Sequence, residues 1–340
     1  MRLKLPSNEQ ILFLANVLLD KVFYARVKSE NIRDILVIKW DEIGDMVVAT
    51  HVFEMLKQKY PQAKIHLICK PFVKPLIAHD PHIDYIATTL HAYNRKFDAV
   101  IVLRGTWTTW LKTFKYRPVN RVSRAVVRWA NKGKQLHEID TNAEVVKPLL
   151  GQMDKLFWPK LYFSADDEQQ VDAFLKQNQL SRFAIVHAGA RKKLRQWPLN
   201  RFALAVKHLK HKHHLDIVFA GTEEDESDIK IINDQLDFKT ASFTRGFSLS
   251  QFNALCSKAS FYLGNESGPL QIASVFNLPL IGLFGPGVKD VFYPRGAKAR
   301  VIHPILECNP CDQVHCVRPE NPCIQLIDIH EVTGTIDILL

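Results

Sequence analysis

Residues 35–45 read ILVIKWDEIGD, a run of apolar residues followed by a polar loop that ends in Gly44-Asp45. Apolar residues at helical spacing follow this loop, at positions 47, 48, 52, 53, 56 and 60. A short apolar run, a loop and an amphipathic helix are typical of a buried parallel strand that leads into the helix packed against it. The stretch therefore predicts an α/β fold whose functional loops lie at the carboxyl ends of strands.

The same strand signal recurs along the chain, at residues 65–69, 98–103, 183–187, 215–220, 260–263 and 278–284. Pro148, Gly151 and Pro159 mark residues 147–167 as the connection between two α/β series. A chain of 340 residues is also longer than one core usually grows. We expect an amphipathic N-terminal extension (1–32), a first Rossmann-like domain (33–160) and a second one (161–340) with a Cys-rich tail at 308–323. Two such halves would enclose a cleft.

The net charge of +10 is concentrated in the first half of the chain. Residues 1–150 hold 24 Lys and Arg against 14 Asp and Glu, whereas residues 151–340 hold 21 of each kind. Residues 112–134 alone contribute eight basic residues and no acid. This asymmetry favours an anionic partner, which can be nucleic acid, a membrane surface or a phosphorylated substrate. Aromatic residues interleave the basic run as in single-strand binders, but no nucleic-acid module accompanies it.

Residues 8–28 form an amphipathic helical pattern with a basic end. Two interpretations stay open: a helix packed on its own domain, or a helix lying on a membrane surface. The longest apolar candidate, residues 11–19, stops at Asp20 and Lys21, which is too short for a membrane span and lacks a signal-peptide cleavage site. Four of the six cysteines cluster at 308–323, which fits a reducing compartment better than a disulfide framework. We therefore expect a cytoplasmic protein.

Asp45 is the first candidate for chemistry, because it follows a buried strand near the start of a helix. A carboxylate there is stabilised by the helix dipole and can take a proton from a bound hydroxyl. The alternative is that Asp45 caps the helix, a role that Asp favours for the same geometric reason.

Residues 264–269 (GNESGP) follow another predicted strand and precede an apolar helix. Exposed amides at such a helix start bind anions such as a diphosphate, although Ser capping with Pro in the first turn explains the same pattern. Residues 187–198 place four cations in five positions after a strand: Arg191, Lys192, Lys193 and Arg195. In a cleft these four cations would neutralise a leaving diphosphate. On an open surface they would only be part of a solvated loop.

The cysteine tail has the spacing C-x2-C-x4-C-x6-C at Cys308, Cys311, Cys316 and Cys323. Four thiols can hold a tetrahedral zinc, but this spacing differs from the usual pairs of C-x-x-C knuckles. We expect no bound metal here, and instead an irregular loop with free or transiently oxidised thiols.

Taken in order, these stretches resemble family 9 glycosyltransferases, the heptosyltransferases of lipopolysaccharide core assembly. The resemblance runs from Ile35 to the end of the chain. It rests on the Cys-rich tail and four segments: ILVIKWDEIGD (35–45), HAGARKKLRQWPLNRF (187–202), FAGTEEDE (219–226) and LGNESGPLQIASVFNLPLIGLFGPG (263–287). It implies a GT-B architecture, with two Rossmann-like domains facing a central cleft, the first for the acceptor and the second for a nucleotide-sugar.

The resemblance also implies roles for single residues. Asp45 matches the proposed general base, Arg195 stands where the family has a phosphate-binding Lys, and Glu224 is the nearest match to an acidic residue that contacts the nucleoside. The implied donor site comprises Lys192, Arg195, Glu224, Glu266, Ser267, Gly268, Pro269 and Gln271. The family usually has Asp and His where this chain has Glu266 and Gln271. ADP-heptose is therefore the default donor, and the sugar stays open.

The implied reaction is a single displacement with inversion that requires no cofactor or metal. The implied acceptor is a phosphorylated, lipid-linked saccharide at the inner face of the inner membrane, where the enzyme would bind peripherally. The expected acceptor-binding residues are Arg104, Arg117, Arg121, Arg124 and Arg128. Nucleic acid is not an expected partner. Two alternatives stay open: a GT-B transferase for another donor such as a UDP-N-acetylhexosamine, and a non-catalytic basic protein that binds RNA or anionic lipid.

Overall fold

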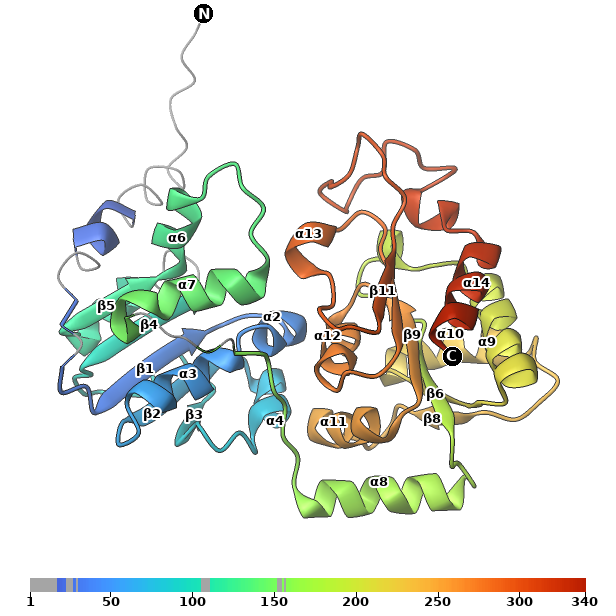
Figure 1. The fold of residues 1–340 in the computed structure, drawn as a ribbon, viewed down its shortest axis with the longest axis horizontal. Helices are drawn as coiled ribbons and strands as arrows, with labels where there is room; N and C mark the ends of the chain where they lie inside the picture. The colour runs from blue at the N-terminus through green and yellow to red at the C-terminus, as the bar shows by residue number, and fades with distance from the viewer. Residues whose placement is uncertain (1–16, 23–26, 29, 105–110, 152–154, 156) are drawn as a thin grey trace, which may run out of the picture. The chain divides into compact units, whose positions relative to one another are not determined.

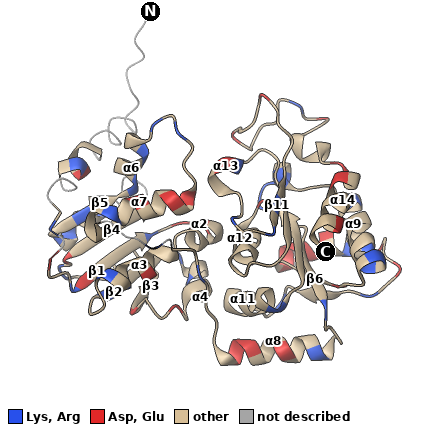
Figure 2. Ribbon diagram, viewed as in Figure 1, with Lys and Arg blue, Asp and Glu red and all other residues tan. Residues whose placement is uncertain are grey.

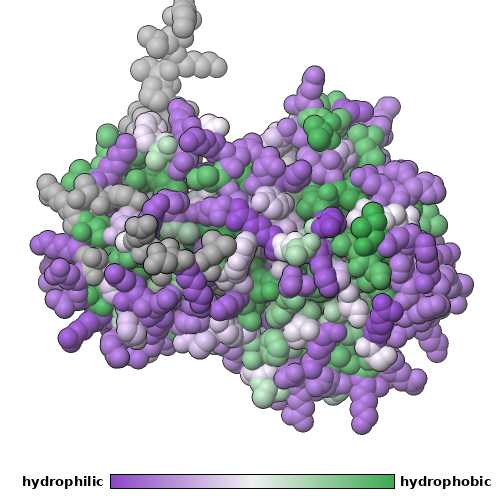
Figure 3. Space-filling model, in the orientation of Figure 1, coloured by the Kyte–Doolittle hydropathy of each residue, from purple (hydrophilic) through white to green (hydrophobic). Residues whose placement is uncertain are grey.

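The computed structural model describes the chain except for residues 1–16, 23–26, 29, 105–110, 152–154 and 156 (Figure 1). The chain divides into two compact units, Met1–Lys160 and Leu161–Leu340, and each is described by itself. Hydrophilic side chains cover most of the visible face of each unit, with apolar patches between them (Figure 3). Among the described residues, no helix combines the length and the apolarity that crossing a bilayer requires.

The first unit is built on a parallel five-stranded sheet with the order β3-β2-β1-β4-β5. The strands are β1 (Asp34–Lys39), β2 (Lys64–Cys69), β3 (Tyr85–Ala87), β4 (Ala99–Arg104) and β5 (Asn120–Ser123). Ile35 of β1 stands opposite Ile65 of β2 and Ala99 of β4, so the apolar run of β1 is buried at the centre of the sheet. The chain order reverses between β1 and β4. In open α/β sheets such a reversal leaves a crevice at the carboxyl ends of the two strands.

The helices of the first unit cover this sheet. They are α2 (Ile43–Val47), α3 (His51–Lys59), α4 (Lys74–Ile77), α6 (Arg124–Ala130) and α7 (Glu138–Leu150), with short 3-10 turns η1 (Pro71–Val73) and η2 (Thr113–Tyr116). Helix α7 packs on both α3 and α6. It also corrects the predicted connection at 147–167, because Pro148 lies inside the last turn of α7. The helix ends at Gly151, whose φ of 73° is a left-handed conformation that favours glycine.

The predicted N-terminal helix lies partly outside the described residues. Residues 17–22 are helical, with Val17 and Asp20 buried and Leu18, Leu19 and Val22 exposed. Asp20 is held inside the unit by Arg121, whose Nε atom donates to its Oδ1 atom at 2.6 Å. The described part of this helix is therefore packed on its own unit along one face and presents apolar side chains on another.

The second unit contains a parallel six-stranded sheet with the order β11-β10-β9-β6-β7-β8. Its strands are β6 (Phe183–His187), β7 (Asp216–Ala220), β8 (Ala241–Phe243), β9 (Phe261–Asn265), β10 (Leu280–Leu283) and β11 (Ala299–Ile302). The chain order reverses here between β6 and β9, where His187 stands opposite Gly264. The carboxyl ends of β6 and β9 therefore form the corresponding crevice of this unit.

Helices flank the second sheet as well (Figure 1). They are α8 (Ala165–Gln177), α9 (Leu199–His213), α10 (Glu226–Asn233), α11 (Leu249–Lys258), α12 (Gly268–Val275), α13 (Lys289–Phe292) and α14 (Ile329–Leu339), with 3-10 turns η3 (Lys193–Arg195), η4 (Glu223–Asp225) and η5 (Cys323–Leu326). Trp197 is fully buried in the core, and its Nε1 atom donates to the Ile327 carbonyl at 3.0 Å. Its main-chain N–H donates to Asn265 Oδ1 at 3.0 Å, which ties the 187–198 loop to the end of β9.

Candidate active site

Asp45 lies in the first turn of α2, at the crevice of the first sheet. The N-cap of this helix is Glu42, so Asp45 is placed within the helix and is not its cap. Arg104, the last residue of β4, donates from Nη1 to Asp45 Oδ1 at 2.9 Å. Burial, together with the charge of Asp41, raises the pKa of Asp45 to about 6, against the opposing charges of Lys39 and Arg104. Asp45 therefore titrates where a general base is useful near neutral pH.

Lys39 and Asp41 complete the charged cluster around Asp45. The Lys39 ammonium is fully buried and lies 3.3 Å from Asp41 Oδ2, while Arg104 Nε lies 3.2 Å from the same oxygen. Burial lowers the pKa of Lys39 although the carboxylates of Asp41, Asp45 and Glu138 act to raise it. The two cations restrain the shift that burial imposes on Asp45.

Three of the five predicted acceptor arginines meet at this end of the sheet. Arg124 begins α6 and forms an ion pair with Glu138, which begins α7. The charges of Arg124, Glu138 and Arg104 all act on Arg128, and burial and the two neighbouring cations lower the pKa of its guanidinium. Figure 2 shows basic residues on α6 and acidic residues at the start of α7. Arg128 is partly covered by these neighbours but keeps exposed surface. Arg117, which follows η2 with a left-handed φ of 42°, is exposed.

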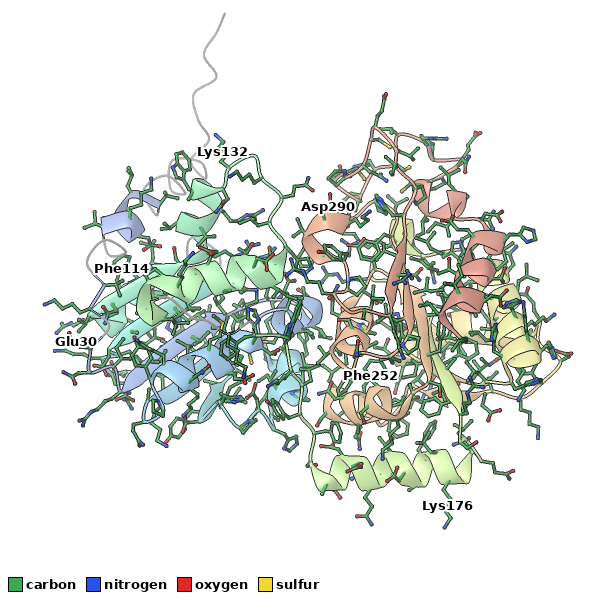
Figure 4. The ribbon with its side chains drawn as sticks, viewed as in Figure 1. Glu30, Phe114, Lys132, Lys176, Phe252 and Asp290 are labelled. Atoms are coloured by element: carbon green, nitrogen blue, oxygen red, sulfur yellow. The ribbon has the colours of Figure 1, made fainter. Side chains whose placement is uncertain are left out.

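Two of the predicted acceptor arginines are used inside the fold, which revises their expected role. Arg121 has no exposed side-chain surface, because its guanidinium pairs with Asp20 and lies over the Phe114 ring. Arg124 is 8% exposed, and its guanidinium makes two hydrogen bonds to the Glu138 carboxylate. A basic run in a sequence does not show which of its cations have buried acidic partners. Arg104, Arg117 and Arg128 keep accessible surface, as do Lys115 and Lys132, the latter in the loop after α6 (Figure 4).

In the second unit, Arg195 and Glu266 meet at the crevice between β6 and β9. Arg195 ends η3, and its Nη1 atom lies 3.5 Å from Oε1 of Glu266, the residue that follows β9. Glu266 is 6% exposed, and burial raises its pKa to about 7 while Arg195 acts in the opposite direction. Glycine at 287 leaves room for this carboxylate, because a Cβ at that position would overlap it.

The amino end of α12 lies beside this pair. Ser267 is the N-cap residue, and its hydroxyl donates to the Asn265 carbonyl at 3.0 Å. Gly268 and Pro269 are the first helical residues, the positions at which Pro is favoured because its missing N–H is not needed there. The amide groups of a helix start attract anions, and a cation such as Arg195 beside them strengthens that attraction.

The other predicted donor-binding residues differ in their contacts and in their exposure. Lys192 donates from Nζ to the Asp312 carbonyl at 3.2 Å. Glu224 is exposed on η4, whereas its neighbour Asp225 turns back to accept from the Thr222 N–H at 2.8 Å. Gln271 is buried and donates from Nε2 to the Phe292 carbonyl at 2.5 Å, so this amide links α12 to α13.

A protein-family model described as glycosyltransferase family 9 (heptosyltransferase) matches residues 89–321. The chain belongs to glycosyltransferase family 9. It is 22% identical over 305 residues to lipopolysaccharide heptosyltransferase 2 of Escherichia coli K12, a match that covers 79% of this chain and 87% of that relative. It is also 22% identical over 280 residues to lipopolysaccharide heptosyltransferase 3 of E. coli, over 71% of this chain and 80% of the relative.

Solved structures of family 9 glycosyltransferases share the fold. A family 9 glycosyltransferase from Veillonella parvula superposes with a TM-score of 0.80 at 19% identity, over 90% of this chain and 97% of that one. The ADP-heptose lipopolysaccharide heptosyltransferase II of E. coli gives a TM-score of 0.73 at 21% identity, over 90% and 98%. An E. coli heptosyltransferase solved with ADP gives 0.66 at 14% identity, over 90% and 100%. The predicted GT-B fold class is confirmed.

The cysteine tail of this glycosyltransferase holds four free thiols. Cys323 is buried, and burial raises the pKa of its thiol, with the thiols of Cys311, Cys316 and Cys308 acting in the same direction. Within the described part of the chain, the group of metal-ligand type whose ligand atoms lie within 4.8 Å of one another is a different one, His208, His213 and Asp337. That less than one zinc is bound per chain stays a prediction, which elemental analysis of protein purified without added metal would check.

The cluster at His208, His213 and Asp337 is explained by ion pairing. Both imidazole Nε2 atoms lie 2.7 Å from Asp337 Oδ1, and the Lys212 ammonium lies 2.8 Å from Oδ2. Together these contacts lower the pKa of Asp337. A cation therefore already occupies the second oxygen of this carboxylate, and the cluster joins the end of α9 to α14.

Sequence reasoning missed the neighbours that set the properties of the predicted residues. Lys39 and Asp41 lie in the same quoted stretch as Asp45, and their charged side chains directly after a buried strand were a signal that could have been used. Glu138 is the first acid after the basic run, which was a weaker signal. Gln313 contacts Arg195 from 118 positions away, and nothing in the local sequence indicates that contact.

Proposed function

We propose that this family 9 glycosyltransferase transfers heptose from ADP-heptose to a phosphorylated, lipid-linked saccharide of the lipopolysaccharide core. The relatives named above, two lipopolysaccharide heptosyltransferases and an E. coli heptosyltransferase solved with ADP, support the substrate class. The observation that carries the proposal is Asp45, a carboxyl with a pKa of about 6 at the crevice of the first sheet, hydrogen-bonded to Arg104.

In the proposed reaction Asp45 acts as the general base. It accepts the proton of the acceptor hydroxyl while the hydroxyl oxygen attacks the anomeric carbon of the donor sugar. The bond between that carbon and the diphosphate oxygen breaks in the same step, and its electron pair leaves with the nucleotide diphosphate. A single displacement of this kind inverts the anomeric configuration, through a transition state with oxocarbenium character.

The leaving diphosphate gains negative charge as the bond breaks, and the second unit offers groups that stabilise it. Arg195 and Lys192 supply positive charge, and the first amides of α12 supply aligned N–H donors. Glu266 and Gln271 stand where the family's usual Asp and His would be. We expect the Glu266 carboxylate to accept hydrogen bonds from the hydroxyls of the sugar.

We place the acceptor on the exposed cations of the first unit. Arg104, Arg117 and Arg128 keep surface for its phosphates and carboxylates, and their attraction should weaken with salt. The exposed apolar residues Leu18, Leu19 and Val22 lie next to Lys21 on the described part of the N-terminal helix. We propose that this helix binds the cytoplasmic face of the inner membrane peripherally.

The test is a panel of nucleotide-sugars with two readouts, thermal stabilisation and transfer to a heptose-deficient lipopolysaccharide acceptor. ADP-heptose is expected to raise the melting temperature in proportion to its affinity and to release ADP only when acceptor is present. Stabilisation by a UDP-N-acetylhexosamine with release of UDP would reassign the donor. If every nucleotide-sugar leaves the melting temperature unchanged while RNA or anionic lipid raises it, the protein is a binding protein and the proposal fails.

A further inference from the structure

The Cys-rich tail contacts both cations that the proposed reaction assigns to the leaving diphosphate. Gln313 Oε1 accepts from Arg195 Nε at 2.7 Å, and the adjacent Asp312 carbonyl accepts from Lys192 Nζ at 3.2 Å. Two consecutive residues of the tail thus bind two side chains of the loop that follows β6. The tail is therefore part of the second unit's crevice.

The backbone of Gln313 is in a conformation that its residue type disfavours. Its φ is 63°, in the left-handed region where glycine and, to a lesser extent, asparagine are at ease. The Gln313 N–H donates to Cys311 Sγ at 3.3 Å, and Asp312 Oδ1 accepts from the Val314 N–H at 2.8 Å, so the turn around it is bonded on both sides. A glutamine in such a turn costs backbone free energy that a glycine would not.

The tail is anchored to the same part of the unit that holds Glu266. The Cys311 N–H donates to the Pro286 carbonyl at 3.4 Å, and Asn309 Nδ2 donates to the Gly285 carbonyl at 3.3 Å. Gly285 and Pro286 thus bind the tail, and the next residue, Gly287, leaves room for the Glu266 carboxylate. Gln313 is fixed with respect to the crevice through this connection.

We propose that Gln313 is a positioning residue, which orients the Arg195 guanidinium for a nucleoside diphosphate. This inference rests on the proposed function of Arg195. With Nε bound to Gln313 and Nη1 placed 3.5 Å from Glu266, the plane of the guanidinium is fixed. A planar guanidinium fixed in this way can present its remaining N–H groups to two phosphate oxygens at once. Lys192, held by the neighbouring carbonyl, would add its charge from the same loop.

The variant Gln313→Gly separates this role from a structural one. Glycine relieves the left-handed backbone, so the melting temperature should stay the same or rise by a few degrees. The contact to Arg195 is lost, so ADP should bind roughly 10-fold more weakly in calorimetry, and KM for the donor should rise more than kcat falls. If the role of Gln313 is purely structural, ADP binding should stay at the wild-type affinity whatever happens to the melting temperature.

The chain offers a matched control in Gln179. This glutamine also has a left-handed backbone, with φ of 54°, and it is exposed just after α8 in the same unit. Gln179→Gly should raise the melting temperature in the same way and leave the affinity for ADP unchanged. Gln313→Asn is the second test variant, because asparagine tolerates the left-handed region but its amide is one methylene shorter. It should weaken ADP binding as Gln313→Gly does.

A double-variant cycle with Arg195→Ala shows whether Gln313 acts through Arg195. In that background Gln313→Gly should weaken ADP binding no further, because the group that it orients is gone. Full wild-type affinity in both Gln313 variants, or an equal loss with and without Arg195, would overturn the inference and leave the proposed function standing. A wild-type protein that binds neither ADP nor UDP would overturn both.

Discussion

Nη1 of Arg104 lies 2.9 Å from Oδ1 of Asp45, across the two strands at which the chain order of the first sheet reverses. Arg104 ends β4, and Asp45 follows β1. The contact sets a positive charge against the burial and the Asp41 charge that raise the pKa of Asp45. Both protonation states of Asp45 are therefore reachable within two pH units of neutrality, which suits a group that must accept a proton and release it again.

Asp45→Asn should abolish transfer while nucleotide-sugar binding stays intact. The amide keeps the shape of the carboxyl group but cannot accept a proton, and loss of a general base costs about 10²- to 10⁴-fold in turnover. Initial rates of ADP release with acceptor present would measure the loss. Because the folded pKa of Asp45 is raised, its ionisation costs stability as pH rises through about 6. The variant should therefore melt no lower than wild type at pH 8, and wild-type turnover would exclude Asp45 as the base.

The acidic limb of the pH profile of kcat/KM should report the ionisation of Asp45, with activity rising as pH increases through about 6. Asp41→Asn removes a charge that raises this pKa, so the limb should move to lower pH. Arg104→Gln removes a charge that lowers it, so the limb should move to higher pH. Profiles of the three proteins over pH 4.5–8 are the measurement. If the acidic limb moves in the same direction in both variants, a group other than Asp45 controls it.

Arg195→Ala should weaken binding of the nucleotide diphosphate and slow transfer, whereas Arg195→Lys should keep part of both. Lysine retains the charge but loses the planar pair of donors that suits phosphate. Calorimetry with ADP and steady-state kinetics would separate the two effects. If the alanine variant binds ADP as tightly as wild type, Arg195 has no role at the diphosphate, and its contact with Glu266 is only structural.

Asp20→Asn should lower the free energy of unfolding by about 3–5 kcal/mol, because it leaves the fully buried Arg121 without its charged partner. Urea denaturation at pH 7 would measure the change. Glu144→Gln is the control: it breaks the exposed pair with Lys147 and should change stability by about 0.5 kcal/mol at most. Replacing both buried partners, Asp20→Leu with Arg121→Met, should recover most of the loss. A wild-type stability for Asp20→Asn would contradict the burial of this pair.

The membrane proposal needs point variants, since deleting residues 1–30 would also remove Asp20. A variant in which Leu18, Leu19 and Val22 are all replaced by serine should co-sediment several-fold less with phosphatidylglycerol vesicles, because the apolar contact with the acyl chains is lost. The control variant replaces Leu204 and Ile231, exposed apolar residues of α9 and α10, by serine, and its co-sedimentation should equal that of wild type. High salt should weaken the binding that remains. Absence of vesicle binding by the wild-type protein at low salt would end the membrane proposal.

The alternation of apolar runs and amphipathic helices was sufficient to predict two parallel α/β series and the fold class. Strand ends also led to Asp45 and Glu266, because parallel strands bring their following loops to one edge of the sheet. Which charged residues form ion pairs could not be predicted from the sequence, because the pairs join positions that are far apart along the chain. Asp20 lies 101 positions from Arg121, and their pairing withdraws Arg121 from the basic surface that the sequence predicted.

Gly287 has a consequence for how this family can diverge. A Cβ at that position would overlap the carboxylate of Glu266, so the two positions share one small volume. Among homologous chains they should therefore vary together, with alanine at the position of Gly287 found where the acidic residue is an aspartate and glycine retained where it is a glutamate. A lineage that starts from glutamate must therefore shorten the acid before it adds a methyl group at 287, whereas a lineage that starts from aspartate must have glycine at 287 before the acid lengthens.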